Sequence, residues 1–525
     1  MKRPLGAQIS HMLKDRGVDT IFGIPGVHNV EMYRGIEEAG ITHVLARHEQ
    51  GAGFMADGYA RATGKPGVAY VITGPGLCNI MTPMGQAYSD SVPMLVMSSC
   101  LDEVAAKKGQ LHQMKDQRAA AETVCDWSEE AKTAQAAYQL VDRAFGEFVT
   151  ARPRPKHIQV PIAVLGAEAE YCAPKTVTPA LPTAGAAQIE AVAKGLAAAK
   201  RPLFVFGGGA LQAAAEARAV LAKTKAASFT SFAGRGVTAM DDPLCFGAGL
   251  IQPESARILE TADYVVAVGT ELAEVDLWRD ELGHKGTFVR VDIDPPMLAD
   301  LMAVPDMTIL SDAKAFLAGL ADVVQSGETE WSAAEVAETR KRWKAEISAD
   351  RPGIVEIADV VLDALPEGTQ IFSDMTQFAY VSKETTYMDA PGRWHHPYGF
   401  GTLGYALPAA IGGKIGVGDA PVIAMAGDYG FQYTVQELGV AVELGLSLPI
   451  ILWDNGKLKE IEDCMVNSQI APNAVQALNP DFCKLAEAWG ALSAAPDSLE
   501  ALRAAIAAAF KADGPTLIYV TPDIL

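Results

Sequence analysis

The stretch that most constrains the fold of this chain is Ala424–Met465. It contains a helix-like segment between two apolar runs, and each apolar run ends in a polar loop. The first run, Val422–Ala426, leads into Gly-Asp-Tyr-Gly, and the second, Leu448–Trp453, leads into Asp-Asn-Gly. The apolar residues between them recur at roughly helical spacing: Val435, Leu438, Val442 and Leu444. Such a strand–helix–strand unit places its strands parallel, with both polar loops at the carboxyl edge of the sheet, where α/β proteins bind ligands.

The two loops carry the kinds of oxygen that a hard cation prefers. Asp428 offers an anionic oxygen and Asn455 a neutral one, and the neighbouring glycines let the backbone come close to a ligand. A helix after Gly430 would direct its free N–H groups toward a phosphate at the same place. One carboxylate, one amide oxygen and phosphate oxygens form the incomplete oxygen shell typical of Mg²⁺ sites. Each feature is also common in α/β proteins without such a site, so the unit alone leaves a purely structural interpretation open.

Length and composition limit the class of protein. A chain of 525 residues is too long for one hydrophobic core and is typical of three domains. Its 49% hydrophobic and 20% charged residues are typical of a globular protein. A formal net charge of −21 disfavours nucleic acid and anionic membranes as partners, because binding to phosphate groups needs basic patches.

The cysteines and the apolar runs indicate a cytoplasmic protein. The seven cysteines are scattered and never spaced as CxxC, which favours reduced thiols over disulfides or a zinc site. The N-terminal segment lacks a signal-peptide core, and no apolar run reaches membrane-spanning length.

Alternating helix and strand patterns predict three α/β domains, each with a doubly wound parallel sheet. The expected domains are 1–165, 187–325 and 353–525, joined by an Ala/Pro/Thr-rich segment (166–186) and a charged segment that contains a helix (327–350). In the central domain, a Gly207-Gly208-Gly209 run follows a strand, but it lacks the GxGxxG spacing of a dinucleotide site.

Two loops of the first domain have both a structural and a chemical interpretation. Glu49 follows a predicted strand and opens a small-residue helix, where the helix dipole alone favours a glutamate. The sequence TGPGLCN, residues 73–79, is typical of a tight turn before a helix. The residues alone therefore leave both loops open to a structural role.

Taken together, these stretches resemble the thiamine diphosphate enzyme family. Its signature is Gly-Asp-Gly, an intervening stretch and Asn-Asn, and the interval from Asp428 to Asn455 suits it. The resemblance implies that Mg²⁺ is bound by Asp428, Asn455 and the backbone carbonyl of Lys457. Tyr429 replaces the second Gly of the signature and Asp454 the first Asn. Neither is an implied ligand, but Tyr429 adds bulk beside the cofactor's diphosphate.

The resemblance also implies roles in the first domain. HEQGAGFMADGYAR is similar to the family segment whose glutamate, here Glu49, hydrogen-bonds the cofactor's pyrimidine and so turns its 4′-amino group into a base. Pro25, Gly26, Gly76 and Asn79 are implied to lie against the cofactor. The residues implied at the reaction face are His28, His112 and Gln113.

In the third domain, the resemblance implies that Thr376 and Gln377 hold the diphosphate and that Leu403 wedges under the cofactor to keep it bent. The other implied contacts of this domain are Gly401, Thr402, Gly427, Tyr429, Gly430 and Leu458, in addition to the metal ligands. In this family such cofactor-binding domains are duplicated, so Glu49 and Asp428 are expected to meet across a subunit interface in a homodimer or homotetramer. Some relatives bind FAD or ADP in the central domain, which this sequence leaves open.

The whole chain resembles the decarboxylase and acetolactate synthase branch of the family. FGIPGVHNVEMYRG and HPYGFGTLGYALPA look most like decarboxylases of 5-guanidino-2-oxopentanoate (2-ketoarginine). We therefore expect a lyase that uses thiamine diphosphate and Mg²⁺ to convert a 2-oxo acid into an aldehyde. Carboligation, as in acetolactate synthase, and a non-catalytic binding or assembly role remain alternatives.

Charged residues after Asn455 bear on the choice of substrate. Lys457 and Lys459 are interpreted as solvated ends of a helix. An inward-pointing Lys459 would favour an anionic substrate tail, whereas Glu460 or Glu462 would favour a guanidinium tail.

Overall fold

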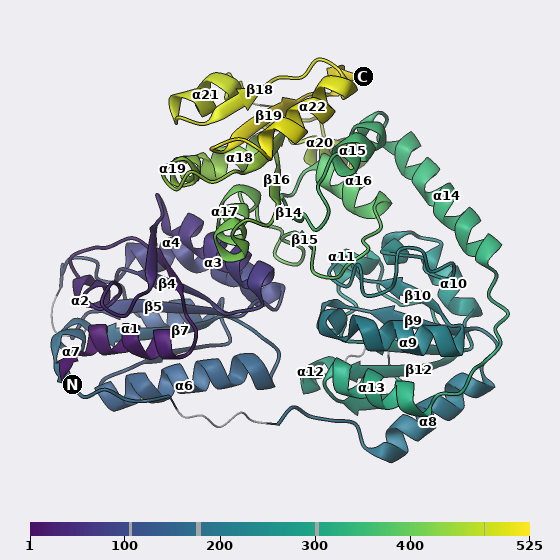
Figure 1. Cartoon of the computed structure of the whole chain (residues 1–525), viewed down its shortest axis with the longest axis horizontal. Helices are drawn as coiled ribbons and strands as arrows, with labels where there is room; N and C mark the ends of the chain where they lie inside the picture. The colour runs from purple at the N-terminus through teal and green to yellow at the C-terminus, as the bar shows by residue number, and fades with distance from the viewer. Residues whose placement is uncertain (104–107, 175–179, 300–303, 477) are drawn as a thin grey trace. The chain divides into compact units, whose positions relative to one another are not determined.

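The chain divides into two compact units, whose helices and strands are labelled in Figure 1. The computed structural model describes residues 1–525 except 104–107, 175–179, 300–303 and 477. The first unit consists of residues 1–179, 360–379 and 395–525, and the second of residues 180–359 and 380–394. Part of the predicted linker 166–186 thus lies outside the described residues.

The N-terminal part of the first unit forms a six-stranded parallel sheet with accompanying helices. Its strands are β2 (Thr20–Gly23), β3 (Thr42–Leu45), β4 (Gly67–Val71), β5 (Met94–Cys100), β6 (Trp127–Glu130) and β7 (Lys156–Pro161), and β1 (Arg3–Pro4) pairs separately with β8 (Glu168–Ala169). Its helices are α1 (Leu5–Asp15), α2 (Val30–Tyr33), α3 (Glu49–Thr63), α4 (Pro75–Ser89), α5 (Gln117–Glu122), α6 (Ala134–Thr150) and α7 (Ile162–Gly166). The strand order β3-β2-β4-β5-β7-β6 reverses between β2 and β4, which is the kind of switch point where α/β sheets bind ligands.

The C-terminal part of the same unit forms a second six-stranded sheet. Its strands are β14 (Gln370–Ser373), β15 (Trp394–His395), β16 (Val422–Gly427), β17 (Pro449–Trp453), β18 (Leu492–Ala494) and β19 (Thr516–Val520). Its helices are α17 (Ala406–Val417), α18 (Asp428–Thr434), α19 (Leu438–Glu443), α20 (Lys459–Asn467), α21 (Phe482–Ala488) and α22 (Leu499–Ala509), with 3-10 turns η3 (Val435–Glu437) and η4 (Pro522–Ile524). Strand β15 and helices α15 (Ile354–Asp363) and α16 (Gln377–Thr385) have residues in both units. The order β15-β14-β16-β17-β19-β18 reverses between β14 and β16, so the loops after these two strands lie at a second switch point.

The second unit contains a five-stranded parallel sheet in the order β10-β9-β11-β12-β13. Its strands are β9 (Pro202–Phe206), β10 (Ala227–Thr230), β11 (Tyr264–Val268), β12 (Thr287–Asp292) and β13 (Met307–Leu310). Its helices are α8 (Ala186–Ala198), η1 (Gly208–Ala213), α9 (Ala214–Thr224), η2 (Gly249–Ile251), α10 (Ser255–Thr261), α11 (Glu274–Leu277), α12 (Pro295–Leu298), α13 (Ala313–Val323) and α14 (Ala333–Asp350). A Cβ added to Gly207 would lie 2.1 Å from the carbonyl oxygen of Gly269, so the glycine run lets the loops after β9 and β11 pack together.

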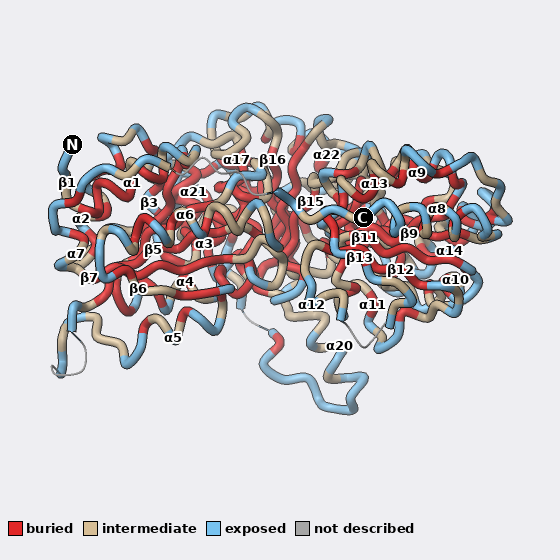
Figure 2. The backbone as a smooth tube through the Cα atoms, turned by 90° about the horizontal axis from the view of Figure 1, so that it is seen from below, coloured by how far each residue is buried: buried red, intermediate tan, exposed pale blue. Residues whose placement is uncertain are grey.

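The three parallel sheets confirm the predicted α/β fold class. Their central strands are buried (Figure 2), which explains why they appear in the sequence as continuous apolar runs. The domain boundaries 1–165, 187–325 and 353–525 remain predictions. No helix among the described residues has both the length and the apolar character needed to cross a bilayer.

Within the first unit, α3 from the N-terminal part packs directly on α17 from the C-terminal part. A Cβ on Gly58 would lie 1.9 Å from the carbonyl oxygen of Ala409, and one on Gly412 would lie 1.9 Å from that of Met55. Side chains at these two positions would push the backbones apart. The two glycines therefore set how closely the two parts approach.

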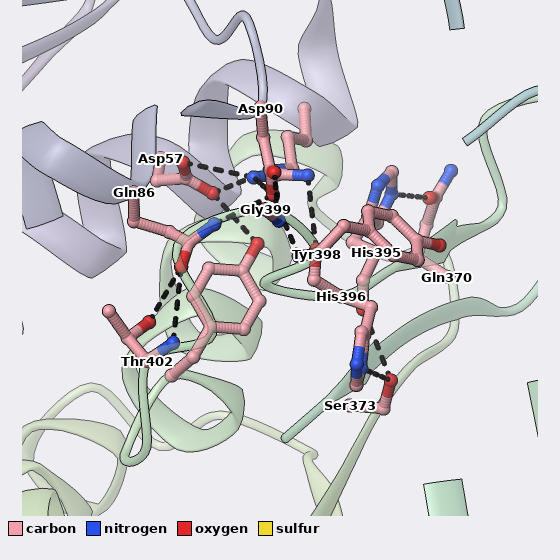
Figure 3. Close-up of polar contacts among 12 residues, drawn as sticks. Asp57, Gln86, Asp90, Gln370, Ser373, His395, His396, Tyr398, Gly399 and Thr402 are labelled. Atoms are coloured by element: carbon pink, nitrogen blue, oxygen red, sulfur yellow. Dashed lines mark hydrogen bonds and ion pairs between the residues drawn. The ribbon is translucent and has the colours of Figure 1, made fainter. Parts of the chain in front are cut away.

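A buried ion network lies beside this helix pair (Figure 3). Arg61 donates to Asp57 Oδ1 at 2.6 Å and to Asp90 Oδ2 at 2.8 Å, and the Tyr405 hydroxyl donates to Asp57 Oδ1 at 2.7 Å. Gln86 extends the network, because its Nε2 donates to Asp90 Oδ2 at 2.8 Å. Residues of both parts of the unit thus share one set of buried charges.

Two helix predictions were wrong in extent. The segment Val30–Glu38, for which the sequence predicts a helix, is helical only as far as Tyr33 (α2), and beyond it Gly35 lies so close to α1 that an added Cβ would be 2.6 Å from Ala7 Cα. The helix expected after Gly430 begins at Asp428, and the following helical run is divided into α18, η3 and α19.

Candidate active site

Asp428 and Asp454 are buried carboxylates at the carboxyl edge of the C-terminal sheet. Strands β16 and β17 pair with Gly427 opposite Trp453, so Asp428 and Asp454 each follow directly after a strand end. The Asn479 side chain donates to Asp428 Oδ2 at 2.8 Å and to Asp454 Oδ1 at 2.9 Å. Burial raises the pKa of Asp428 to about 6, and the neighbouring Asp454 adds to the rise. A cation at this edge would oppose both effects.

The two residues that depart from the family signature, Asp454 and Tyr429, lie just after the ends of neighbouring strands. Asp454 Oδ1 accepts from the backbone N–H of Gly456 at 2.8 Å, and Oδ2 accepts from the Tyr519 hydroxyl at 2.9 Å. Asp454 therefore closes the turn that follows β17, as aspartates commonly do. Tyr429 lies in the first turn of α18 and is partly exposed.

The structure brings several predicted diphosphate contacts next to each other. Asn455 Nδ2 lies 3.4 Å from Gln377 Oε1, and Asn455 Oδ1 accepts from the Lys457 backbone N–H at 3.3 Å. A Cβ on Gly427 would lie 2.9 Å from Thr376 Oγ1. The loops after β14, β16 and β17 therefore meet at the switch point. Leu458 lies nearby in sequence, and its N–H donates to the carbonyl of Val475 at 2.8 Å.

Asp374, which sequence reasoning missed, organises the same edge. It is buried and accepts from the N–H groups of Met375 at 2.8 Å and Gly404 at 3.0 Å. A Cβ on Gly430 would lie 2.8 Å from Asp374 Oδ2, so this glycine is needed for the close approach. Burial raises the pKa of Asp374 to about 6. Its position directly after β14, like that of Asp428 after β16, was the available sequence signal.

The predicted wedge segment, Gly401–Leu403, is held by the N-terminal part of the unit. The backbone N–H and the hydroxyl of Thr402 both donate to Gln86 Oε1, at 3.3 and 2.9 Å (Figure 3). Leu403 itself is half-buried. The ion network beside α3 and α17 therefore also fixes the residues expected under the cofactor.

Glu49 lies at the carboxyl edge of the N-terminal sheet. It is 8% exposed and opens α3, directly after the loop that follows β3. Its Oε2 accepts from Asn79 Nδ2 at 2.9 Å, and a Cβ on Gly76 would lie 3.3 Å from Oε1. Glu49 thus lies beside Gly76 and Asn79, the two predicted residues of the TGPGLCN loop. Among the described residues, Asn79 is the hydrogen-bond partner of its side chain.

The other predicted residues of this edge also come together. Cβ atoms on Gly26 and Gly76 would lie 2.2 and 2.8 Å from the side chain of Ile72, so the loops after β2 and β4 pack on the same residue. The rings of His28 and His112 meet edge to face with centroids 4.8 Å apart. Pro25 is exposed, and the backbone N–H of Gln113 donates to the carbonyl of Gln110 at 3.2 Å.

His112 has a strained backbone that the TGPGLCN loop supports. Its φ is 60°, a conformation that is unusual for a side chain other than glycine. A Cβ on Gly74 would lie 2.4 Å from the His112 carbonyl oxygen, so the glycine allows this approach. The Nδ1 atoms of His28 and His112 are buried without a hydrogen-bond partner among the described residues. Burial lowers the pKa of His28, and His112 lowers it further.

Glu437, also missed from sequence, connects the two halves of the predicted site within one chain. Its carboxylate accepts from the backbone N–H groups of Arg47 and His48, immediately before Glu49. Glu437 ends η3, between α18 and α19, so Asp428 and Glu437 are separated by roughly 15 Å along this helical run. No spacing rule pairs Glu437 with residues about 390 positions away.

The residues at both edges fit the implied cofactor and metal. No cluster of three or more His, Cys, Asp or Glu side chains that could hold a metal occurs in the described part of the chain. The predicted Mg²⁺ ligands instead comprise one carboxylate, one amide and one backbone carbonyl, a set that leaves room for phosphate oxygens. The buried acid Asp428, with its raised pKa, and the Nδ1 atoms of His28 and His112, which lack a hydrogen-bond partner within the described part of the chain, are the groups that such a ligand would satisfy.

Comparison with protein-family models gives three matches in chain order. The N-terminal TPP binding domain of thiamine pyrophosphate enzymes matches residues 3–120, the central domain residues 189–320, and the C-terminal TPP binding domain residues 374–520. The two switch-point edges described above fall in the first and last of these segments.

Comparison with curated proteins gives relatives along nearly the whole chain. The chain is 43% identical over 523 residues to the probable 2-ketoarginine decarboxylase AruI of Pseudomonas aeruginosa, covering 98% of this chain and 93% of that protein. It is 27% identical to the acetolactate synthase isozyme 2 large subunit of Escherichia coli, covering 99% and 96% of the two chains. It is 30% identical to the acetolactate synthase large subunit of Corynebacterium glutamicum, covering 87% and 76%.

Proposed function

Because this chain belongs to the thiamine pyrophosphate enzyme family, we propose that it binds thiamine diphosphate with Mg²⁺ and decarboxylates a 2-oxo acid to an aldehyde. The observation that carries the proposal is the placement of Glu49, buried at one switch point, together with Asp428 and Asn455 at the other. The 43% identical relative supports decarboxylation over carboligation.

The C-terminal edge would hold the metal and the diphosphate. Asp428, Asn455 and the carbonyl of Lys457 would bind Mg²⁺, and Thr376 and Gln377 lie beside them to bind phosphate oxygens. Asn479 orients the Asp428 carboxylate by donating to Oδ2. Metal binding would remove the electrostatic cost of burying two neighbouring acids.

The N-terminal edge would supply the proton chemistry. When bound, thiamine diphosphate supplies a nucleophilic carbon and an electron sink for the departing CO₂. Glu49 Oε1, which faces Gly76, would hold a proton, while Asn79 fixes Oε2. His28 and His112 would contact the reacting carboxylate and carbonyl through ring nitrogens that have no other partner among the described residues.

The active unit is proposed to be a homodimer, with a homotetramer as a further assembly. In one chain, Glu49 and Asp428 lie at opposite ends of the helical run that joins Glu437 to Asp428. As the family resemblance implies, a single cofactor would use Glu49 of one subunit and Asp428 of the other. The seven free cysteines favour a reducing compartment such as the cytoplasm.

The substrate is proposed to be 5-guanidino-2-oxopentanoate. Lys457 pairs with Glu462 at 2.9 Å, and Lys459 pairs with Glu462 and Asp463 on its own helix. Both lysines are therefore neutralised locally, so neither offers a free cation to an anionic substrate tail. Three acids against two lysines between Lys457 and Asp463 leave this segment suited to a guanidinium group.

A panel of 2-oxo acids tests the proposal. The purified protein with thiamine diphosphate and Mg²⁺ should release CO₂ and a free aldehyde from 5-guanidino-2-oxopentanoate faster than from pyruvate or from a 2-oxo acid with a carboxylate tail. Production of acetolactate from pyruvate would instead support the carboligase alternative, which the acetolactate synthase relatives favour. Failure to release CO₂ from every member of the panel would contradict the proposed activity.

A further inference from the structure

Glu437 is a completely buried acid that contacts the loop carrying Glu49. Its exposed fraction is 0%, and it lies at the end of η3, directly before α19. Oε2 accepts from the Arg47 N–H at 3.0 Å, and Oε1 accepts from the His48 N–H at 2.9 Å. Both carboxylate oxygens are thus used to hold the residues that immediately precede Glu49.

The surrounding residues fit closely around the Glu437 carboxyl group. A Cβ on Gly51 would lie 2.3 Å from the Glu437 carboxyl carbon, so only a glycine in the first turn of α3 permits the approach. Burial raises the pKa of Glu437 to about 7, Arg47 and His48 oppose the rise, and Glu49 adds to it. Arg47 also forms an ion pair with the more exposed Glu443, which lies one helix further along the chain.

We propose that Glu437 is a positioning residue for Glu49 of its own chain, and that it acts on the cofactor bound to the partner subunit. The inference rests on the proposed function, which assigns Glu49 and Asp428 of one chain to two different active sites. The helical run from Asp428 to Glu437 then connects the diphosphate end of one site to the proton-holding acid of the other. Two backbone N–H groups fix the loop at adjacent residues, which restrains the direction in which Glu49 leaves the start of α3.

The first test compares Glu437→Gln with Glu443→Gln. Glutamine keeps the size of Glu437 but places an amide N–H₂ against one of the two backbone donors. E437Q should lower kcat roughly 10- to 100-fold with little change in KM, because the reacting groups are misaligned by a displaced Glu49. E443Q removes the other carboxylate that contacts Arg47 and should keep nearly full activity. Equal activity of E437Q and wild type would overturn the proposal.

Mixed dimers then separate positioning of Glu49 from a general structural role. A dimer of one Asp428→Ala and one Glu49→Gln subunit retains one intact site and serves as the reference. Replacing its E49Q subunit by E437Q leaves a site built from the unperturbed Glu49 of the D428A chain, so activity should equal the reference. Replacing instead the D428A subunit by E437Q leaves a site that depends on the displaced Glu49, so activity should fall roughly 10- to 100-fold.

Each of the other possible results of the mixed-dimer experiment would overturn one part of the proposal. The reverse pattern would show that Glu437 acts on its own diphosphate loop, and equal loss in both mixed dimers would show a general structural role; both overturn the positioning inference. An active wild type with an inactive reference dimer would overturn the assignment of Glu49 and Asp428 to different sites. If E437Q folds poorly, Gly51→Ala replaces it in these dimers. The added methyl group forces the Glu437 carboxylate away, so G51A should give the pattern expected for E437Q.

Discussion

The crossing of α3 and α17 gives a prediction whose sign can be worked out from the structure. Gly412→Ala introduces a Cβ 1.9 Å from the Met55 carbonyl oxygen and 2.6 Å from its carbonyl carbon. Both are backbone atoms, so they do not rotate away and the helices must separate. Overpacking of this kind costs about 1–3 kcal/mol, whereas the gain from replacing a glycine within a helix by alanine is only about 0.5–1 kcal/mol.

Gly146→Ala is the matched control, because it makes the same substitution inside α6, where an added Cβ meets no atom of the described residues within 4 Å apart from the backbone of its own helix. Chemical denaturation followed by far-UV circular dichroism should show a lower free energy of unfolding for G412A and a gain of about 0.5–1 kcal/mol for G146A. Because α17 follows Leu403 closely, G412A should also weaken thiamine diphosphate binding. A G412A protein as stable as G146A would refute the argument that these glycines set the helix spacing.

Three further predictions concern buried polar groups. Arg61→Met should lower the free energy of unfolding by about 3–5 kcal/mol in the same denaturation assay, because it leaves buried Asp57 and Asp90 without their cation. The control Arg34→Gln, which breaks the exposed ion pair with Glu31, should have little effect. Burial lowers the pKa of His157 from 6.5 to about 3. Between these pH values the unfolded chain binds more protons than the folded protein, so the free energy of unfolding falls as pH decreases. His157→Gln should flatten this pH dependence in denaturation experiments at a series of pH values, and an unchanged slope would contradict the prediction. Asn479→Ala should raise the Mg²⁺ concentration needed for half-maximal activity roughly 10- to 100-fold, because Asp428 loses the amide that orients it; an unchanged requirement would remove Asn479 from the site.

The local pattern of the sequence was sufficient to predict the strands and the loops that follow them. The apolar runs and the helical spacing between them located β16 and β17. Because strands joined by a helix lie parallel, Asp428 and Asn455 were then expected at the same edge of the sheet. The family, the α/β fold and the enzyme class predicted from the motifs are confirmed by the comparisons. The individual roles of His28, His112 and Gln113 remain predictions.

The residues that sequence reasoning missed depend on contacts between distant segments. Glu437 lies in an ordinary helical pattern, and its role is visible only when the N–H groups of Arg47 and His48 are found against it. Asn479 is likewise defined by two carboxylates that precede it by 51 and 25 positions.

The central claim is that Glu49 supplies the proton chemistry to a cofactor held by Asp428. Calorimetric titration with thiamine diphosphate and Mg²⁺, followed by measurement of CO₂ release from the same samples, tests it most directly. Wild type should bind and release CO₂, Glu49→Gln should bind but release CO₂ at least about 100-fold more slowly, and Asp428→Ala should give little binding heat. A wild-type protein that gives no heat, or a Glu49→Gln protein that releases CO₂ at the wild-type rate, would contradict the account.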